Sequence, residues 1–208
     1  MEPRPQHNGD WVIAPREDLC LDFANTLYWR GTPTPTERLK AWSDVLDWYE
    51  ATKLLPAGQM ATLKRAFREH DREASADLRD AIALRESLYA IFSATAAQKK
   101  PRDEDLAVLN RALAESPPRR ALRGAQAGYG WAVTSGDAAP AALFAPILWS
   151  ASDLLVGARL ARVRRCANDA CLWLFLDDSK SGNRRWCSMS ACGNRAKAHR
   201  HYVRHKDD

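Results

Sequence analysis

The 208-residue sequence lacks the features of several large classes of protein. Its most apolar window, residues 141–161, is rich in alanine but is interrupted by a proline, two serines and an aspartate, which argues against a membrane span. The first ten residues, MEPRPQHNGD, contain no apolar core of the kind that a secretory signal has. No internal repeat or low-complexity segment is present. We therefore expect a cytoplasmic protein in a reducing environment, with no membrane partner.

The usual signatures of enzymes are missing too. The residues before the cysteine cluster contain no glycine-rich nucleotide-binding loop and no pair of histidines at metal-binding spacing, and no serine lies in the context of a nucleophile elbow. We therefore expect that the protein is not an enzyme. The remaining enzymatic hypothesis places an activity around Asp22, Asn25 and Arg85, and no motif supports it.

Cysteine is scarce, with five residues in all, but four of them lie between Cys166 and Cys192. The first pair, Cys166 and Cys171, and the second pair, Cys187 and Cys192, each enclose four residues, and fifteen residues separate the pairs. Two turns that each carry two thiolates are what a tetrahedral four-cysteine zinc site requires. Two disulfides would need an oxidising compartment, and a catalytic zinc would keep one position open for water. The spacing therefore predicts one structural zinc ion per chain.

The residues around these cysteines resemble a known family. Cys192 opens the tetrapeptide CGNR, RRWC spans Arg184–Cys187, and FLDDS spans Phe175–Ser179. The chain is similar in these motifs to the CGNR zinc-finger proteins, and LCLDFANTL at Leu19–Leu27 resembles the opening motif of their N-terminal ABATE domain. The resemblance implies a bacterial transcription regulator whose finger is the DNA-binding element.

The basic charge is confined to the C-terminal part of the chain. Residues 158–208 carry 12 basic and 5 acidic residues, whereas the rest of the chain carries 19 and 21. Such asymmetry predicts a local surface for a polyanion. Four thiolates on zinc carry a formal charge of −2, so some of the nearby arginines are expected as counter-charge, but not all twelve basic residues.

These patterns predict a mainly α protein with two domains. We expect a helical ABATE-like domain over residues 1–160, with one small β-hairpin within residues 120–134. A capping box at Thr34–Glu37 predicts a helix start, with Ser43 as a competing start. A helix over residues 141–164, apolar nearly all round from Leu143 to Leu155 and basic at its end, is expected to run directly into Cys166. Residues 161–208 would form the zinc finger, rigidly attached.

Within the finger we expect a short β-hairpin followed by a basic helix. Leu172–Leu176 reads as a strand, and Arg184–Trp186 is expected to lead back beside it. The aromatic residues Trp173, Phe175 and Trp186 would form a small core whose stability comes mainly from the metal.

The helix after Cys192, with Asn194 as its N-cap, has no acidic residue before Asp207. Like charges along one helix repel each other, and phosphates would neutralise them. The residues predicted to contact nucleic acid, most simply double-stranded DNA, are Arg184, Arg185, Arg195, Lys197, Arg200, Arg204 and Lys206. A solvated tail is the alternative for this segment, and its histidines are not needed as zinc ligands.

The role of the helical domain is left more open by the sequence. Asp22 and Asn25 are polar positions in an apolar segment, so they either hold nearby backbone or line a small-molecule pocket with Arg85. We expect Asp22 to pair with Arg85, and Cys20 to be a core thiol. The domain would bind an effector or mediate association, for instance as a homodimer. The alternative function is a zinc-stabilised protein-interaction module that does not bind nucleic acid.

Overall fold

A computed structural model of the chain describes residues 11–13, 16–55, 57–68, 74–125, 128–133 and 140–206. Helices dominate these residues, as predicted: α1 (Leu19–Ala24), α2 (Trp42–Ala51), α3 (Ala57–Arg68), α4 (Ala74–Ala96), α5 (Asp103–Glu115), α6 (Pro140–Val156) and α7 (Asn194–Lys206). The strands are short: β1 (Trp11–Ile13), β2 (Leu27–Tyr28), β3 (Thr36–Glu37), β4 (Leu122–Ala125), β5 (Gly128–Val133), β6 (Val163–Arg165) and β7 (Leu174–Leu176). A 3₁₀-helix at Ala158–Arg162 and a π-helical turn at Met189–Gly193 complete the elements.

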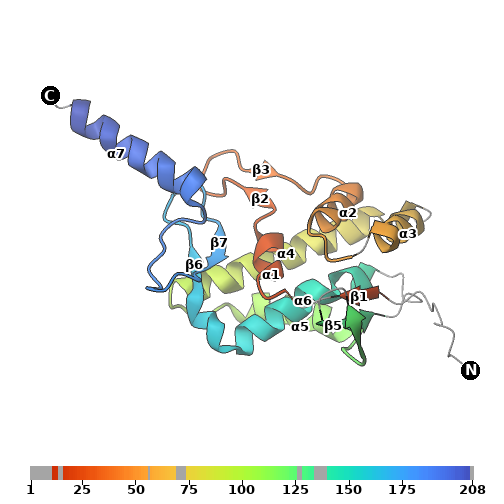
Figure 1. The fold of residues 1–208 in the computed structure, drawn as a ribbon. Coiled ribbons are helices and arrows are strands. Elements are labelled where there is room, and N and C mark those ends of the chain that lie inside the picture. The colour runs from red at the N-terminus through yellow and green to blue at the C-terminus, as the bar shows by residue number, and fades with distance from the viewer. Residues whose placement is uncertain are drawn as a thin grey trace, which may run out of the picture.

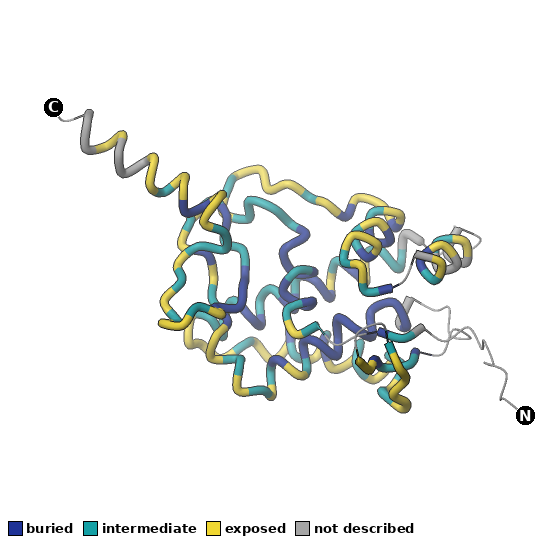
Figure 2. The backbone as a smooth tube through the Cα atoms, viewed as in Figure 1, coloured by how far each residue is buried: buried dark blue, intermediate teal, exposed yellow. Residues whose placement is uncertain are grey.

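The short helix α1 lies at the centre of the molecule. It packs against α4, α6 and β7, so the N-terminal LCLDFANTL motif joins the helical body to the C-terminal finger (Figure 1). Leu19, Leu21 and Phe23 are buried, and α6 is buried along most of its length (Figure 2). An α-helix that is apolar all round is stable only at such a central position. None of the helices that the structure describes is long and apolar enough to cross a membrane.

The predicted hairpin within residues 120–134 is confirmed and carries an additional strand. β4 and β5 are antiparallel, and β1 pairs with the other edge of β5, placing Trp11 opposite Val133. Three residues near the N-terminus carry too little pattern to be recognised as a strand, so the sequence did not predict β1.

The predicted helix start at Thr34–Glu37 is wrong. Thr36 and Glu37 form β3, which pairs with β2, and α2 begins at Trp42, one residue before the competing start at Ser43. The carboxylate of Asp44 accepts the backbone N–H groups of Lys40 (2.7 Å) and Ala41 (2.8 Å), and thereby caps the first turn of α2.

The helix predicted over residues 141–164 ends eight residues earlier, at Val156. Gly157 has an extended backbone, and a Cβ atom there would lie 2.6 Å from the carbonyl oxygen of Asp153, so the close approach of the departing chain to the last turn of α6 needs glycine at this position. The 3₁₀-helix at Ala158–Arg162 then leads into β6, the first strand of the finger, which is paired with β7 and packs on α4.

Candidate metal centre and the basic helix

The four predicted zinc ligands converge on one point. The Sγ atoms of Cys166, Cys171, Cys187 and Cys192 all lie within 4.8 Å of one another. The Cys171–Cys187 and Cys187–Cys192 sulfur distances are 3.7 and 3.8 Å. Tetrahedral zinc with Zn–S bonds of about 2.3 Å places its sulfurs about 3.8 Å apart, whereas a disulfide needs about 2.05 Å. The four cysteines therefore fit one structural zinc ion, and these sulfur–sulfur distances are too long for the alternative of two disulfides.

The first cysteine pair sits at the turn of the β6–β7 hairpin. Cys166 directly follows β6, and its backbone N–H donates to the carbonyl of Trp173 (2.7 Å). The N–H of Cys171 donates to the carbonyl of Asn168 (2.8 Å), which forms a turn between the two ligands. Leu172, directly after the second ligand, has a positive φ of 58° where the chain enters the returning strand.

The partner of β7 differs from the prediction. β7 pairs with β6 and not with Arg184–Trp186, because the backbone N–H of Arg184 donates to the buried carboxylate of Asp177 (2.8 Å). A hydrogen bond from the Ser179 hydroxyl lowers the pKa of Asp177, which keeps this carboxylate charged.

The surroundings of the cysteines favour metal binding. The amide of Asn168 donates to the sulfur of Cys192 (3.4 Å), which orients one ligand. The hydrogen bond between Cys171 and Cys187 lowers the pKa of Cys171 and raises that of Cys187. A lowered pKa favours the thiolate, which is the form of cysteine that binds a metal.

Cys20 behaves differently from the four ligands. It is fully buried in the core next to Ser150, and burial raises the pKa of its thiol to about 12. The prediction of a core thiol is confirmed.

The small core of the finger contains the three predicted aromatic residues and one from the body. Phe175 is buried against the cysteines, and Trp173 and Trp186 pack beside them. The fourth is Trp29, whose backbone has a positive φ of 56° and whose ring lies 4.6 Å from the guanidinium of Arg195. Trp29 links the helical body to the base of α7, and nothing in its local sequence pointed to this role.

The helix after the fourth cysteine starts earlier than predicted. Ser188 is the N-cap of the π-helical turn, accepting the N–H of Ala191 (3.4 Å), and Asn194 already has helical backbone angles. Asn194 is therefore not the N-cap. From here α7 projects away from the rest of the molecule (Figure 1).

The predicted nucleic-acid residues fall into three groups. Arg184 faces inward: its guanidinium donates to the carbonyls of Trp186 (2.8 Å) and Cys187 and lies 4.6 Å from the ring of Phe175. The structure therefore gives Arg184 a structural role. The exposed cations are Arg185, Arg195 and Lys197. The side chains of a third group lie outside the described part of the chain, namely Arg200, Arg204 and Lys206.

Asn25 joins the finger to the helical body. Its side-chain amide donates to the carbonyl of Leu174 (2.8 Å), and its Oδ1 accepts the N–H of the same residue (2.9 Å). β6 occupies one edge of β7, and Asn25 satisfies the other edge in the manner of a neighbouring strand. The reading that Asn25 holds backbone is the one the structure supports, although that backbone lies 149 residues away.

Replacing Asn25 by alanine should lower the free energy of unfolding by about 2–4 kcal/mol, because the buried N–H and C=O of Leu174 would both lose their partner. Amide hydrogen exchange at Leu174 should accelerate in parallel. The matched control is Asn110→Ala at an exposed position of α5, which should change neither quantity. Unchanged protection of Leu174 in the Asn25 variant would contradict the assigned contact.

A close approach of the backbones completes this junction. A Cβ atom at Gly31 would lie 1.5 Å from the carbonyl oxygen of Asp169, and the N–H of Gly31 donates to the carbonyl of Ala170 (3.3 Å). The hydroxyl of Tyr89 on α4 donates to the carbonyl of Leu172 (3.0 Å). The metal-binding turn of the finger therefore contacts the helical body through its backbone carbonyl groups.

The predicted Arg85–Asp22 pair is wrong. Arg85 is 2% exposed and forms two parallel hydrogen bonds with Glu37 (2.6 and 2.7 Å), and a third with Glu86 (2.8 Å). Glu86 also pairs with Arg30 at 2.7 Å, while Asp22 pairs with Arg16. Arg85 on α4 therefore pairs with Glu37 because β3 lies beside α4 in the folded chain, and the sequence alone did not show that these two elements are neighbours.

Removal of the Glu37 carboxylate should have a pH-dependent effect. Burial raises the pKa of Glu37, but the hydrogen bonds from Arg85 and from the backbone N–H of Leu39, together with the charge of Arg85, outweigh burial and leave the pKa lowered. Its contribution to stability is therefore complete above the unfolded-state pKa of about 4.3 and is lost as the pH falls through the folded-state value. In urea unfolding, Glu37→Gln should cost about 1–3 kcal/mol at neutral pH and progressively less in acid. A loss that is independent of pH, or equal to that of exposed Glu115→Gln, would refute this assignment.

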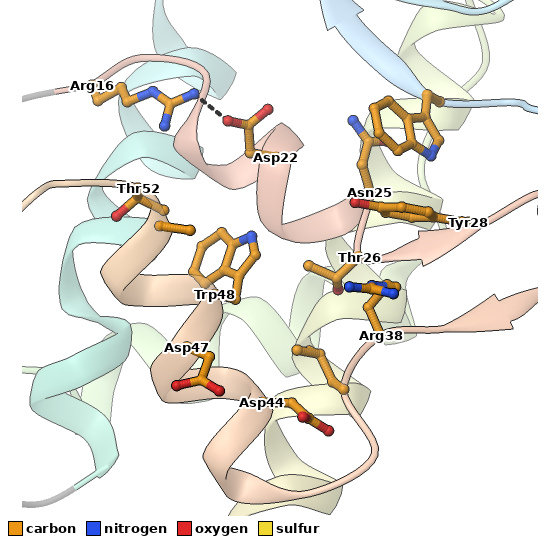
Figure 3. Close-up of a pocket in the computed structure, with 13 residues that line it drawn as sticks. Arg16, Asp22, Asn25, Thr26, Tyr28, Arg38, Asp44, Asp47, Trp48 and Thr52 are labelled. Carbon is orange, nitrogen blue, oxygen red and sulfur yellow. Dashed lines mark hydrogen bonds and ion pairs between the residues drawn. The ribbon is translucent and has the colours of Figure 1, made fainter. Parts of the chain in front are cut away.

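Of the three predicted pocket residues, two line a cleft and one does not. Asp22 and Asn25 lie on one wall of a cleft of about 470 Å³ between α1 and α2, opposite Trp48 (Figure 3). Arg85 does not line this cleft.

The fold and this site together define a four-cysteine zinc-finger protein in which the finger is docked on a helical body. A family model for the ABATE domain, described as "Putative stress-induced transcription regulator", matches residues 17–158. A model for the CGNR zinc finger matches residues 162–205. The chain therefore belongs to the ABATE family and carries a CGNR zinc finger. No curated protein matches the sequence.

Proposed function

We propose that this protein is a transcription regulator that binds double-stranded DNA with α7 and the adjoining surface of the zinc finger. The observation that carries the proposal is the projecting helix. No acidic residue occurs between Arg195 and Lys206, and α7 extends away from the body, where a major groove could receive it (Figure 1). The description of the family as a transcription regulator supports the same function.

Some cations of the finger have hydrogen-bond or ion-pair partners within the chain, and others are exposed to solvent. Arg159 pairs with Glu17 and Asp178, and Arg184 is held by backbone carbonyls. By contrast, the exposed cations Arg185 and Lys197 pair with no carboxylate in the described part of the chain. Partners within the chain therefore account for only some of the basic residues of the finger, and the others are available for phosphates.

The alternative is that the finger serves only as a structural cap or a protein-interaction module. The docking contacts of Asn25 and Tyr89 favour a structural contribution. The contact of Trp29 with Arg195 involves only the first turn of α7, however, so a capping role does not account for the rest of the acid-free helix. Since a single small finger buries little DNA surface, two copies per binding site are expected.

Fluorescence anisotropy of a labelled mixed-sequence DNA duplex, titrated with zinc-loaded protein across a salt series, tests this function. If about five phosphates are contacted, the plot of log K against log salt should have a slope of about −4 to −5. Duplex RNA and single-stranded DNA of matched length serve as competitors and should displace the duplex less well. A slope near zero, or no binding at moderate salt, would refute the proposal.

A further inference from the structure

The cleft between α1 and α2 has the size and composition of a small-molecule site. Its volume of about 470 Å³ lies within the range of about 300–1,000 Å³ that ligand pockets occupy. Its lining comes from α1 and the adjoining β2, from the segment after β3, from α2 and from Trp173 of the finger, together with Arg16 before α1 (Figure 3).

The carboxylates in the lining already have partners. Asp22 pairs with Arg16, and Asp47 pairs with the ammonium group of Lys64 (2.8 Å). The carboxylate of Asp44 accepts two backbone N–H groups at the start of α2. A cationic ligand would have to compete with these existing partners.

Arg38 is in a different position. Its guanidinium is exposed and lies 5.5 Å from the ring of Tyr28, and it pairs with no carboxylate among the residues that the structure describes. Its backbone N–H donates to the carbonyl of Thr26 (3.2 Å), so the backbone that carries the guanidinium is held in place. An exposed guanidinium of this kind can form two parallel hydrogen bonds with one carboxylate.

Aromatic side chains provide the apolar part of the cleft. Trp48 packs against Phe23 with ring centroids 5.2 Å apart, and Tyr28 meets Trp173 edge to face at 4.9 Å. These contacts hold three of the lining rings in place (Figure 3). A planar ring between them would gain both apolar burial and aromatic contact.

We propose that this cleft binds a small aromatic carboxylate, with its carboxylate on Arg38 and its ring against Trp48. The ligand would also touch Asn25 and Trp173, which lie at the junction between the helical body and the finger. Binding at this site does not depend on whether the finger binds DNA.

Three probes of nearly equal size test the proposal on the zinc-loaded full chain: phenylacetate, the neutral phenylacetamide and the cationic phenethylamine. Calorimetry should show saturable binding of phenylacetate, at least about tenfold weaker binding of phenylacetamide, and none of phenethylamine. Arg38→Gln should reduce the affinity for phenylacetate to that for phenylacetamide. Lys40→Gln, an exposed cation two residues away that does not line the cleft, is the matched control.

The position of the ligand is tested by the indole N–H signals in a nitrogen-15 NMR spectrum, assigned with Trp48→Phe and Trp173→Phe. Phenylacetate should shift the signals of Trp48 and Trp173 and leave those of Trp131 and Trp149, which lie at another site. Preference for phenethylamine, equal affinity in Arg38→Gln, shifts confined to Trp131 and Trp149, or no saturable binding by any probe would each overturn the proposal.

Discussion

Replacing Cys171 by serine should reduce the zinc content from about one ion per chain to nearly none. Serine does not ionise at neutral pH, so the site would keep three thiolates in a shell that structural zinc needs closed by four. Structural zinc sites contribute an apparent free energy of about 10–16 kcal/mol, more than the total stability of a typical domain. Zinc content measured by elemental analysis on the purified protein is the direct test.

Loss of zinc should also weaken the helical body. Val163, Leu174 and Leu176 belong to the finger strands, yet they are buried in the same hydrophobic core as α4 and α6. We therefore expect the Cys171→Ser variant, and wild-type protein treated with a chelator, to unfold at a clearly lower temperature throughout.

Cys20→Ala is the matched control for this experiment, because it removes a cysteine that lies in the core away from the metal site. It should keep one zinc ion per chain. Retention of zinc by Cys171→Ser would contradict the four-cysteine site. An unchanged unfolding temperature of the body would contradict the shared core.

Reversing two charges on α7 should abolish most DNA binding. In Arg200→Glu combined with Arg204→Glu, two cations of the acid-free helix become anions, and each cation that no longer meets a phosphate removes about 0.9 from the salt slope. We expect affinity to fall at least about tenfold and the slope to flatten by about 2. Position 200 lies one turn from Lys197, which favours the helix, whereas the two new carboxylates lie one turn from each other, which disfavours it, so the local effects on helix stability should largely offset each other.

The control reverses two exposed arginines with the same change of net charge, Arg65→Glu on α3 and Arg79→Glu in the N-terminal half of α4. α3 lies at the opposite end of the molecule from α7 (Figure 1). An equal loss in this control would assign the effect to net charge alone. No loss in the α7 variant would instead favour the protein-interaction module.

The sequence predicted some features of the finger correctly and others incorrectly. The finger hairpin is an instructive case, since Leu172–Leu176 contains β7 as expected but its partner strand precedes Cys166. Periodicity identified the apolar strand, whereas the choice of partner followed from where Asp177 holds the backbone of Arg184. A strand of three residues carries too little pattern to identify its neighbour.

The zinc ligands and the acid-free helix were determined by the sequence alone. The reason is that two cysteines on one turn, or basic residues on one helix, are brought together by local backbone geometry. The tertiary structure decided the rest: that Asn25 completes the edge of β7, that Trp29 supports Arg195, and that Glu37 neutralises Arg85. These partners lie 149, 166 and 48 residues apart, and only the packing of the core brings them within hydrogen-bonding or stacking distance.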